Sequence, residues 1–148
     1  PMFRPIRPED EAIFLQFSEQ FYHSPAVLHP IPASYHRATF EELMRSDTYL
    51  SCYLFEVNGQ PVGYALTNRT FSHETGGPVL WLEELYLLPD YRSRGLGRAM
   101  FSYLEQNSGA ARIRFEVEPN NRRALALYRA LGYQDLDYLQ MYKDLPSD

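Results

Sequence analysis

The feature that most constrains the fold is a nearly continuous apolar segment, Val79 to Leu88, followed directly by a glycine-rich turn. A strand that is apolar at consecutive positions is covered on both faces of its sheet. Pro89 ends the segment, and apolar residues on one face predict a helix from about Gly95 to Asn107. We therefore expect a buried strand, a turn and a helix in succession.

Two helices are predicted near the start of the chain. Pro8 through Tyr22 carries apolar residues four apart, as on one face of a helix. His23 to Ser34 contains three prolines, which exclude a regular helix and indicate a loop or a broken helix. Thr39 and Glu42 form the pattern of a capping box, so we expect a short helix to begin there and to end near Asp47.

A hairpin is predicted between these helices and the buried strand. Tyr49 to Val57 and Pro61 to Thr70 are rich in β-branched and aromatic residues. Asn58 and Gly59 between them suit the positive φ angles of a two-residue turn. This is the clearest hairpin in the sequence.

The last third of the chain alternates between strand and helix patterns. Arg112 to Glu118 alternates apolar and charged residues and predicts a strand. A helix is expected over Asn121 to Leu131, closed by Gly132, and a final strand over Tyr138 to Lys143. The order predicts one α/β domain over residues 1–148, with a mixed, mostly antiparallel sheet and helices on both faces.

Composition narrows the class of protein. The net charge is −5, which argues against nucleic acid as a partner and is compatible with a cationic small molecule. Cys52 is the single cysteine, so no disulfide can form within the chain. No secretory signal is visible, and no apolar stretch approaches the roughly 20 residues of a membrane helix. We expect a soluble, cytoplasmic protein that contacts no membrane.

The turn after the buried strand has the composition of a phosphate-binding loop. Glycines let the backbone approach an anion, and the N–H groups of the following first helical turn point toward it. Arg92, Arg94 and Arg98 add positive charge. Met100 stands where a dinucleotide fingerprint needs a third glycine, and the Gly-Lys-Ser/Thr of a P-loop is absent. Taken alone, the Gly-x-Gly is also compatible with a simple tight turn.

Two segments carry a family resemblance. Arg92-x-x-Gly95-x-Gly97 resembles the acyl-CoA signature of the GNAT N-acetyltransferase superfamily, and Asn121-x-x-Ala124-x-x-x-Tyr128 resembles its second conserved segment. The resemblance covers roughly residues 48–143. Within the superfamily, the stretch from Trp81 to Arg92 looks most like the diamine (spermidine/spermine) N-acetyltransferase branch. The resemblance to the superfamily implies the GNAT-type acyl-CoA N-acyltransferase fold, with acetyl-CoA as co-substrate.

The resemblance also implies which residues hold the cofactor. Backbone groups of Leu85, Tyr86 and Leu87 would pair with the pantetheine arm. Asn121 would lie near the same arm. The pyrophosphate would be held by Arg92, Ser93, Arg94, Gly95, Leu96, Gly97 and Arg98.

Roles in the reaction follow from the same resemblance. Glu83, directly or through a water, would take the proton of the acceptor ammonium, and Tyr128 would protonate the departing thiolate. Glu84 is the candidate ligand for the substrate ammonium. Because consecutive strand residues face opposite sides, we expect that Glu83 and Glu84 do not point into the same cleft. Either carboxylate could instead pair with an arginine, and Tyr128 could be a core residue.

The remaining alternatives concern the acceptor. A polyamine, diamine or amino-acid-like amine is favoured over a protein N-terminus or lysine and over an aminoglycoside. A catalytically silent acyl-CoA-binding sensor is a further alternative.

The four histidines show no metal-ligand spacing, so no metal is expected. They are expected on the surface or in loops, although those from His23 to His36 fall where the family places its substrate-side loop. The resemblance also implies a homodimer.

Overall fold

The computed structural model describes residues 2–146, in two compact parts. One part ends at Glu116 and the other begins at Val117. The first part holds the strands β1 (Phe3–Pro5), β2 (Leu50–Val57), β3 (Gln60–Ser72), β4 (Gly77–Leu87) and β5 (Arg112–Arg114), the helices α1 (Glu11–Tyr22), α2 (Ala33–Arg45) and α3 (Leu96–Asn107), and the short 3-10 helices η1 (Pro8–Asp10) and η2 (Pro89–Tyr91). The second part holds α4 (Arg122–Ala130).

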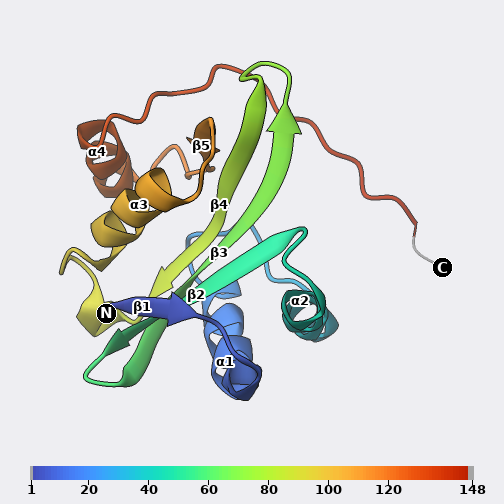
Figure 1. Ribbon diagram of the computed structural model, residues 1–148, viewed down its shortest axis with the longest axis vertical. Coiled ribbons are helices and arrows are strands. Elements are labelled where there is room, and N and C mark those ends of the chain that lie inside the picture. Colours follow the sequence, from blue (N-terminus) through green and yellow to red (C-terminus); the bar gives the residue numbers. More distant parts are fainter. Residues whose placement is uncertain (1, 147–148) are drawn as a thin grey trace. The chain divides into compact units, whose positions relative to one another are not determined.

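The strands form one sheet in the order β1-β2-β3-β4-β5 (Figure 1). Neighbouring strands from β1 to β4 are antiparallel, and β5 pairs with β4 in parallel. The predicted mixed, mostly antiparallel sheet is therefore confirmed.

Helices cover both faces of this sheet, as expected. On one face, α1 packs a cluster of aromatic residues against Leu54, Leu66 and Tyr86. On the other face lies α3, where Tyr103 contacts the ring of Tyr53 at 5.6 Å between centroids. Because Tyr53 and Leu54 are consecutive residues of a strand, these contacts belong to opposite faces.

The hairpin of β2 and β3 forms as predicted. Asn58 and Gly59 have φ values of 53° and 77°, which the two-residue turn requires. Further along β3, a Cβ on Gly63 would lie 2.1 Å from the carbonyl oxygen of Tyr86. Glycine at this position therefore permits the close approach of β3 and β4.

The second helix begins earlier than the sequence indicated. Pro32 is the N-cap of α2, and Thr39 lies inside the helix, where its hydroxyl donates to the carbonyl oxygen of Tyr35 at 2.8 Å. The predicted capping box at Thr39 is therefore wrong. Proline suits the start of a helix because its missing N–H would have no partner there.

The last third of the chain differs most from the prediction. β5 ends at Arg114, four residues before the expected end, and residues 138–143 form no strand. An alternating pattern forms a strand only where a neighbouring strand completes its hydrogen bonds, and residues 134–146 join no ladder in the described chain. α4 agrees with the prediction, and Gly132 follows it with φ of 94°. β1, which pairs with β2, was not expected.

Candidate active site

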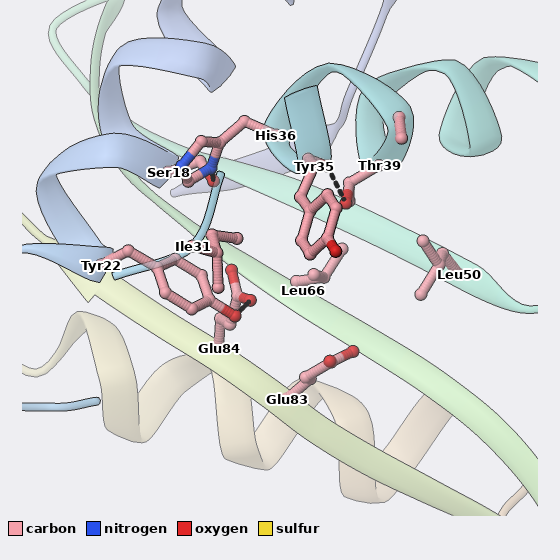
Figure 2. Close-up of a pocket in the computed structure, with 11 residues that line it drawn as sticks. Ser18, Tyr22, Ile31, Tyr35, His36, Thr39, Leu50, Leu66, Glu83 and Glu84 are labelled. Atoms are coloured by element: carbon pink, nitrogen blue, oxygen red, sulfur yellow. Dashed lines mark hydrogen bonds between the residues drawn. The ribbon is translucent and has the colours of Figure 1, made fainter. Parts of the chain in front are cut away.

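A β-bulge in β4 brings both glutamates to one pocket. Leu66 of β3 pairs with Glu84, and the next residue, Thr67, pairs with Leu82, so Glu83 is an extra residue without a pairing position. A bulge of this kind re-aims the neighbouring side chains. Glu83 and Glu84 accordingly both line the pocket (Figure 2), and the expectation that they face different sides is wrong.

The pocket has a volume of about 370 Å³ and lies between the first two helices and the sheet. Its walls combine carboxylates, phenols, a histidine, two hydroxyl side chains and small or branched apolar residues. They are contributed by α1 (Ser18, Tyr22), the following loop (Ile31), α2 (Tyr35, His36, Ala38, Thr39), β2 (Leu50), β3 (Leu66) and β4 (Glu83, Glu84). Such a site suits a small molecule that carries positive charge.

Glu84 is held at the back of the pocket by two phenols. The hydroxyl of Tyr64 donates to Oε1 and that of Tyr22 to Oε2, each at 2.7 Å. Only 7% of Glu84 is exposed, and this burial raises the pKa of its carboxyl group, although both hydrogen bonds act in the opposite direction. Glu84 is therefore a buried acid whose two oxygens are both held by phenols.

Glu83 has a different environment. Its side chain is exposed, and Oε2 accepts a hydrogen bond of 2.9 Å from the side-chain amide of Asn68. An exposed carboxyl group exchanges protons with water directly. The two neighbouring glutamates thus differ in burial and in hydrogen-bond partners.

His36 lines the pocket from within α2, and not from a loop. It is 6% exposed, and its Nδ1 forms a hydrogen bond with the hydroxyl of Ser18. Burial lowers the pKa of His36, so that the neutral ring is favoured. The expectation of a surface or loop histidine is wrong at this position, because the helix that carries His36 starts before it and packs on α1.

The outer edge of β4 is open beyond its short pairing with β5. β5 pairs only with Val79 to Trp81. In the part of the chain that the structure describes, no strand joins β4 on that side from Leu82 to Leu87. The segment predicted to pair with the pantetheine arm, Leu85 to Leu87, lies on this edge. An extended, amide-containing chain could add here as a strand would.

The turn from β4 into α3 has the geometry of an anion cradle. Ser93 and Gly95 have φ values of 61° and 85°, and Gly95 is the N-cap of α3 with no side-chain cap. Leu96 is buried and anchors the first turn of the helix. Gly97 lies against β4, since a Cβ there would be 3.6 Å from Cδ2 of Leu85. The first-turn N–H groups of such a helix attract negative charge.

Three exposed arginines surround this turn. Nε of Arg92 donates to the carbonyl oxygen of Leu87 at 2.8 Å, and its guanidinium carbon is 5.8 Å from the ring centre of Tyr86. Arg94 lies 5.0 Å from the ring centre of Tyr91, and Arg98 is on the first turn of α3. The cradle, the arginines and the open edge of β4 together fit a pantetheine diphosphate such as CoA.

The second part of the chain contains the other two predicted site residues. Asn121 is the N-cap of α4, and its Oδ1 accepts from the N–H of Ala124 at 3.2 Å. Tyr128 lies in α4 and is half-buried, and burial raises the pKa of its phenol. The structure thus shows Asn121 as a helix-capping residue. Its contact with the cofactor stays a prediction.

Other kinds of site find no support in the described residues. Residues 2–146 contain no group of three or more His, Cys, Asp or Glu side chains that could hold a metal ion. Within the same range, no helix is both long and apolar enough to cross a membrane.

The fold, the cradle before α3 and the unpaired edge of β4 fit an acyl-CoA-dependent transferase. The acetyltransferase (GNAT) family matches residues 12–133, and the chain belongs to this family. It is an acetyl-CoA-dependent N-acetyltransferase.

Relatives in this family act on different amines. A thialysine N-ε-acetyltransferase from Bos taurus is 33% identical over 113 residues, which is 65% of each chain. A ribosomal protein bS18-alanine N-acetyltransferase from Escherichia coli (strain K12) is 30% identical over 124 residues, 82% of this chain and 77% of the relative. A solved structure of an aminoglycoside N-acetyltransferase in complex with CoA has a TM-score of 0.77 at 20% identity, covering 96% of this chain and 93% of that one. The likeness to that structure concerns the fold.

Because the pKa of His36 is lowered in the folded protein, stability should fall on acidification. Below the unfolded-state value of about 6.5, the unfolded chain binds a proton that the folded chain resists. The free energy of unfolding should therefore decrease as the pH falls from about 7, by at most about 1.4 kcal/mol per pH unit for one group. Urea denaturation at a series of pH values measures this, and His36→Gln should reduce the slope. The exposed His73→Gln is the control, and an equal change in both variants would contradict the assignment.

Proposed function

We propose that the acceptor is a small cationic primary amine, in particular a diamine or polyamine. The observation that carries this proposal is the presence of two carboxylates, Glu83 and Glu84, in one pocket of about 370 Å³. Two neighbouring carboxylates in a partly enclosed site favour a ligand with positive charge. Leu50, Leu66 and Ile31 offer apolar contacts to the carbon chain of such an amine.

We assign a different role in the reaction to each of the two glutamates. An amine at neutral pH is an ammonium ion and must lose a proton before it can attack. We assign this proton to Glu83, directly or through a water, because an exposed carboxylate can pass it on to solvent. Glu84, which is fixed by Tyr22 and Tyr64, would hold an ammonium group in place.

The cofactor assignments remain those that the resemblance implies. The backbone of Leu85, Tyr86 and Leu87 would hold the pantetheine arm, together with Asn121. The segment from Arg92 to Arg98 would hold the pyrophosphate, in agreement with the left-handed Ser93 and Gly95. When bound, acetyl-CoA supplies the acetyl thioester. Tyr128 would then protonate the leaving thiolate; a phenol is protonated at neutral pH, and burial raises the pKa of this one further.

The proposal also covers the cellular location and the oligomeric state of the protein. We propose a cytoplasmic homodimer, by analogy with the acetyltransferases that the motifs resemble. Cys52 is buried and unpaired, and burial raises the pKa of its thiol, as suits a cysteine with a packing role.

An amine panel tests the proposed acceptor. Free thiol released from acetyl-CoA should be highest with alkyl diamines and polyamines, and mass spectrometry should find one added acetyl group on the product. Highest activity with aminoglycosides or with alanine-terminal peptides would contradict the acceptor class. Stabilisation by acetyl-CoA without thiol release for any amine would instead indicate an acyl-CoA sensor.

Replacement of Glu83 should alter the pH dependence of the reaction. In Glu83→Gln, the rise of kcat/KM for the amine with pH should flatten, because the group that takes the ammonium proton is gone. Glu41→Gln is a matched control, since Glu41 is an exposed acid on α2 outside the pocket. A profile identical to that of the wild type would show that free amine is simply taken from solution.

Replacement of Tyr128 should separate chemistry from binding. Tyr128→Phe should lower kcat by roughly ten- to a thousandfold, as expected for a lost general acid. The affinity for acetyl-CoA, measured by calorimetry, should be nearly unchanged. Tyr133→Phe, which changes another tyrosine of the same part of the chain, serves as the control. Unchanged turnover in Tyr128→Phe would remove this phenol from the mechanism.

A further inference from the structure

A row of four paired residues crosses the sheet from the wall of the pocket to the last strand. Leu50 of β2 pairs with Asn68 of β3, and Asn68 pairs with Trp81 of β4. Trp81 pairs in turn with Arg114 of β5. Side chains at paired positions point to the same face of a sheet. Since Leu50 lines the pocket, the other three residues continue its wall along that face.

Asn68 connects this row to the acidic end of the pocket. Its side-chain amide donates to Oε2 of Glu83 at 2.9 Å, and Glu83 lines the pocket. Trp81 lies opposite Asn68 and two residues before Glu83 in β4. Paired residues have Cβ atoms about 5 Å apart, so the row passes close beside the pocket at Glu83.

Arg114, at the end of the row, carries a positive charge without an acidic partner. Its guanidinium carbon lies 4.1 Å from the ring centre of Trp81, and the residue is half-buried. In residues 2–146 no carboxylate lies within ion-pair distance of Arg114, whereas Arg112 on the same face pairs with Glu74 at 2.7 Å. A guanidinium held against an indole ring keeps its full charge.

The helices cover only part of this face of the sheet. Residues of α1 and α2 close the pocket on the side away from the sheet. β3 and β4 extend past both helices at the end where these two strands join (Figure 1). A ligand longer than the pocket can therefore continue along the sheet, over the row that ends at Arg114.

We propose that Arg114 is a specificity-determining residue that limits the acceptor to short diamines. The inference rests on the proposed cationic acceptor. A short diamine can place its two ammonium groups at the neighbouring carboxylates of Glu83 and Glu84. A longer diamine or polyamine would carry an ammonium group past Glu83 toward Arg114, where like charges repel. The guanidinium also covers a face of Trp81 that would otherwise attract an ammonium ion.

Diamines of two lengths test the charge of Arg114. Arg114→Gln should raise kcat/KM for 1,8-diaminooctane relative to 1,3-diaminopropane roughly three- to thirtyfold, because the repulsion is gone. Arg114→Lys keeps the charge and should stay close to the wild-type ratio. Arg69→Gln is the matched control, since Arg69 is exposed and pairs with Leu80 on the opposite face of the sheet. An unchanged ratio in Arg114→Gln, or an equal change in Arg69→Gln, would overturn the inference.

A neutral acceptor of the same length separates charge from shape. The compound 8-amino-1-octanol ends in a hydroxyl group where 1,8-diaminooctane carries its second ammonium. Arg114→Gln should therefore leave kcat/KM for the amino alcohol, relative to 1,3-diaminopropane, unchanged. An equal gain for the amino alcohol and for 1,8-diaminooctane would show that the side chain acts by its size, and would overturn the inference.

Calorimetry on the protein with CoA bound is independent of turnover. Arg114→Gln should bind 1,8-diaminooctane more tightly than the wild type, by a factor similar to the kinetic one. This gain in affinity without acetylation of any amine would contradict the proposed function alone. Equal kcat/KM of the wild type for the short and the long diamine would overturn the inference and leave the proposed function intact. Absence of binding for every diamine would contradict both.

Discussion

The bulge at Glu83 is the constraint on which the pocket of Glu83 and Glu84 depends. β4 has α1 on one face and α3 on the other, so regular alternation would give its two consecutive carboxylates to different faces. One extra residue at Glu83 places both beside the same pocket while Leu66 stays paired with Glu84 and Tyr64 with Tyr86. The bulge disrupts the hydrogen bonds between β3 and β4 only locally, because pairing continues on both sides of it.

Burial of Glu84 then determines much of the surrounding structure. A carboxylate without partners would be costly in this position, and each of its oxygens receives one phenol. These hydrogen bonds tie α1, β3 and β4 together through one side chain, and the pair of Ser18 and His36 adds α2. The walls of the pocket are therefore fixed by the same contacts that set the ionisation of its buried acid.

The sequence predicted features that depend on neighbouring residues, and it did not predict contacts between residues that lie far apart in the chain. Asn58-Gly59 indicated its turn, and Gly95 indicated the turn before α3, because each depends on φ angles available to few residues. The bulge could not be predicted, since Glu83 and Glu84 fit an alternating strand equally well. The contact of Tyr22 with Glu84 spans 62 residues, and no spacing in the sequence reports it. Residues 138–143 show the opposite failure, a plausible strand pattern that joins no ladder in the described chain.

Burial affects two titratable groups of the proposed mechanism, Tyr128 and Glu84. Conversion of an ammonium ion to an amide releases two protons from nitrogen, and the thiolate takes one of them back. Burial raises the pKa of the Tyr128 phenol, and it raises the pKa of the Glu84 carboxyl group against the effect of its two phenol hydrogen bonds. Under the proposed roles, the two carboxylates of the pocket would select an acceptor by its positive charge and not by its shape alone.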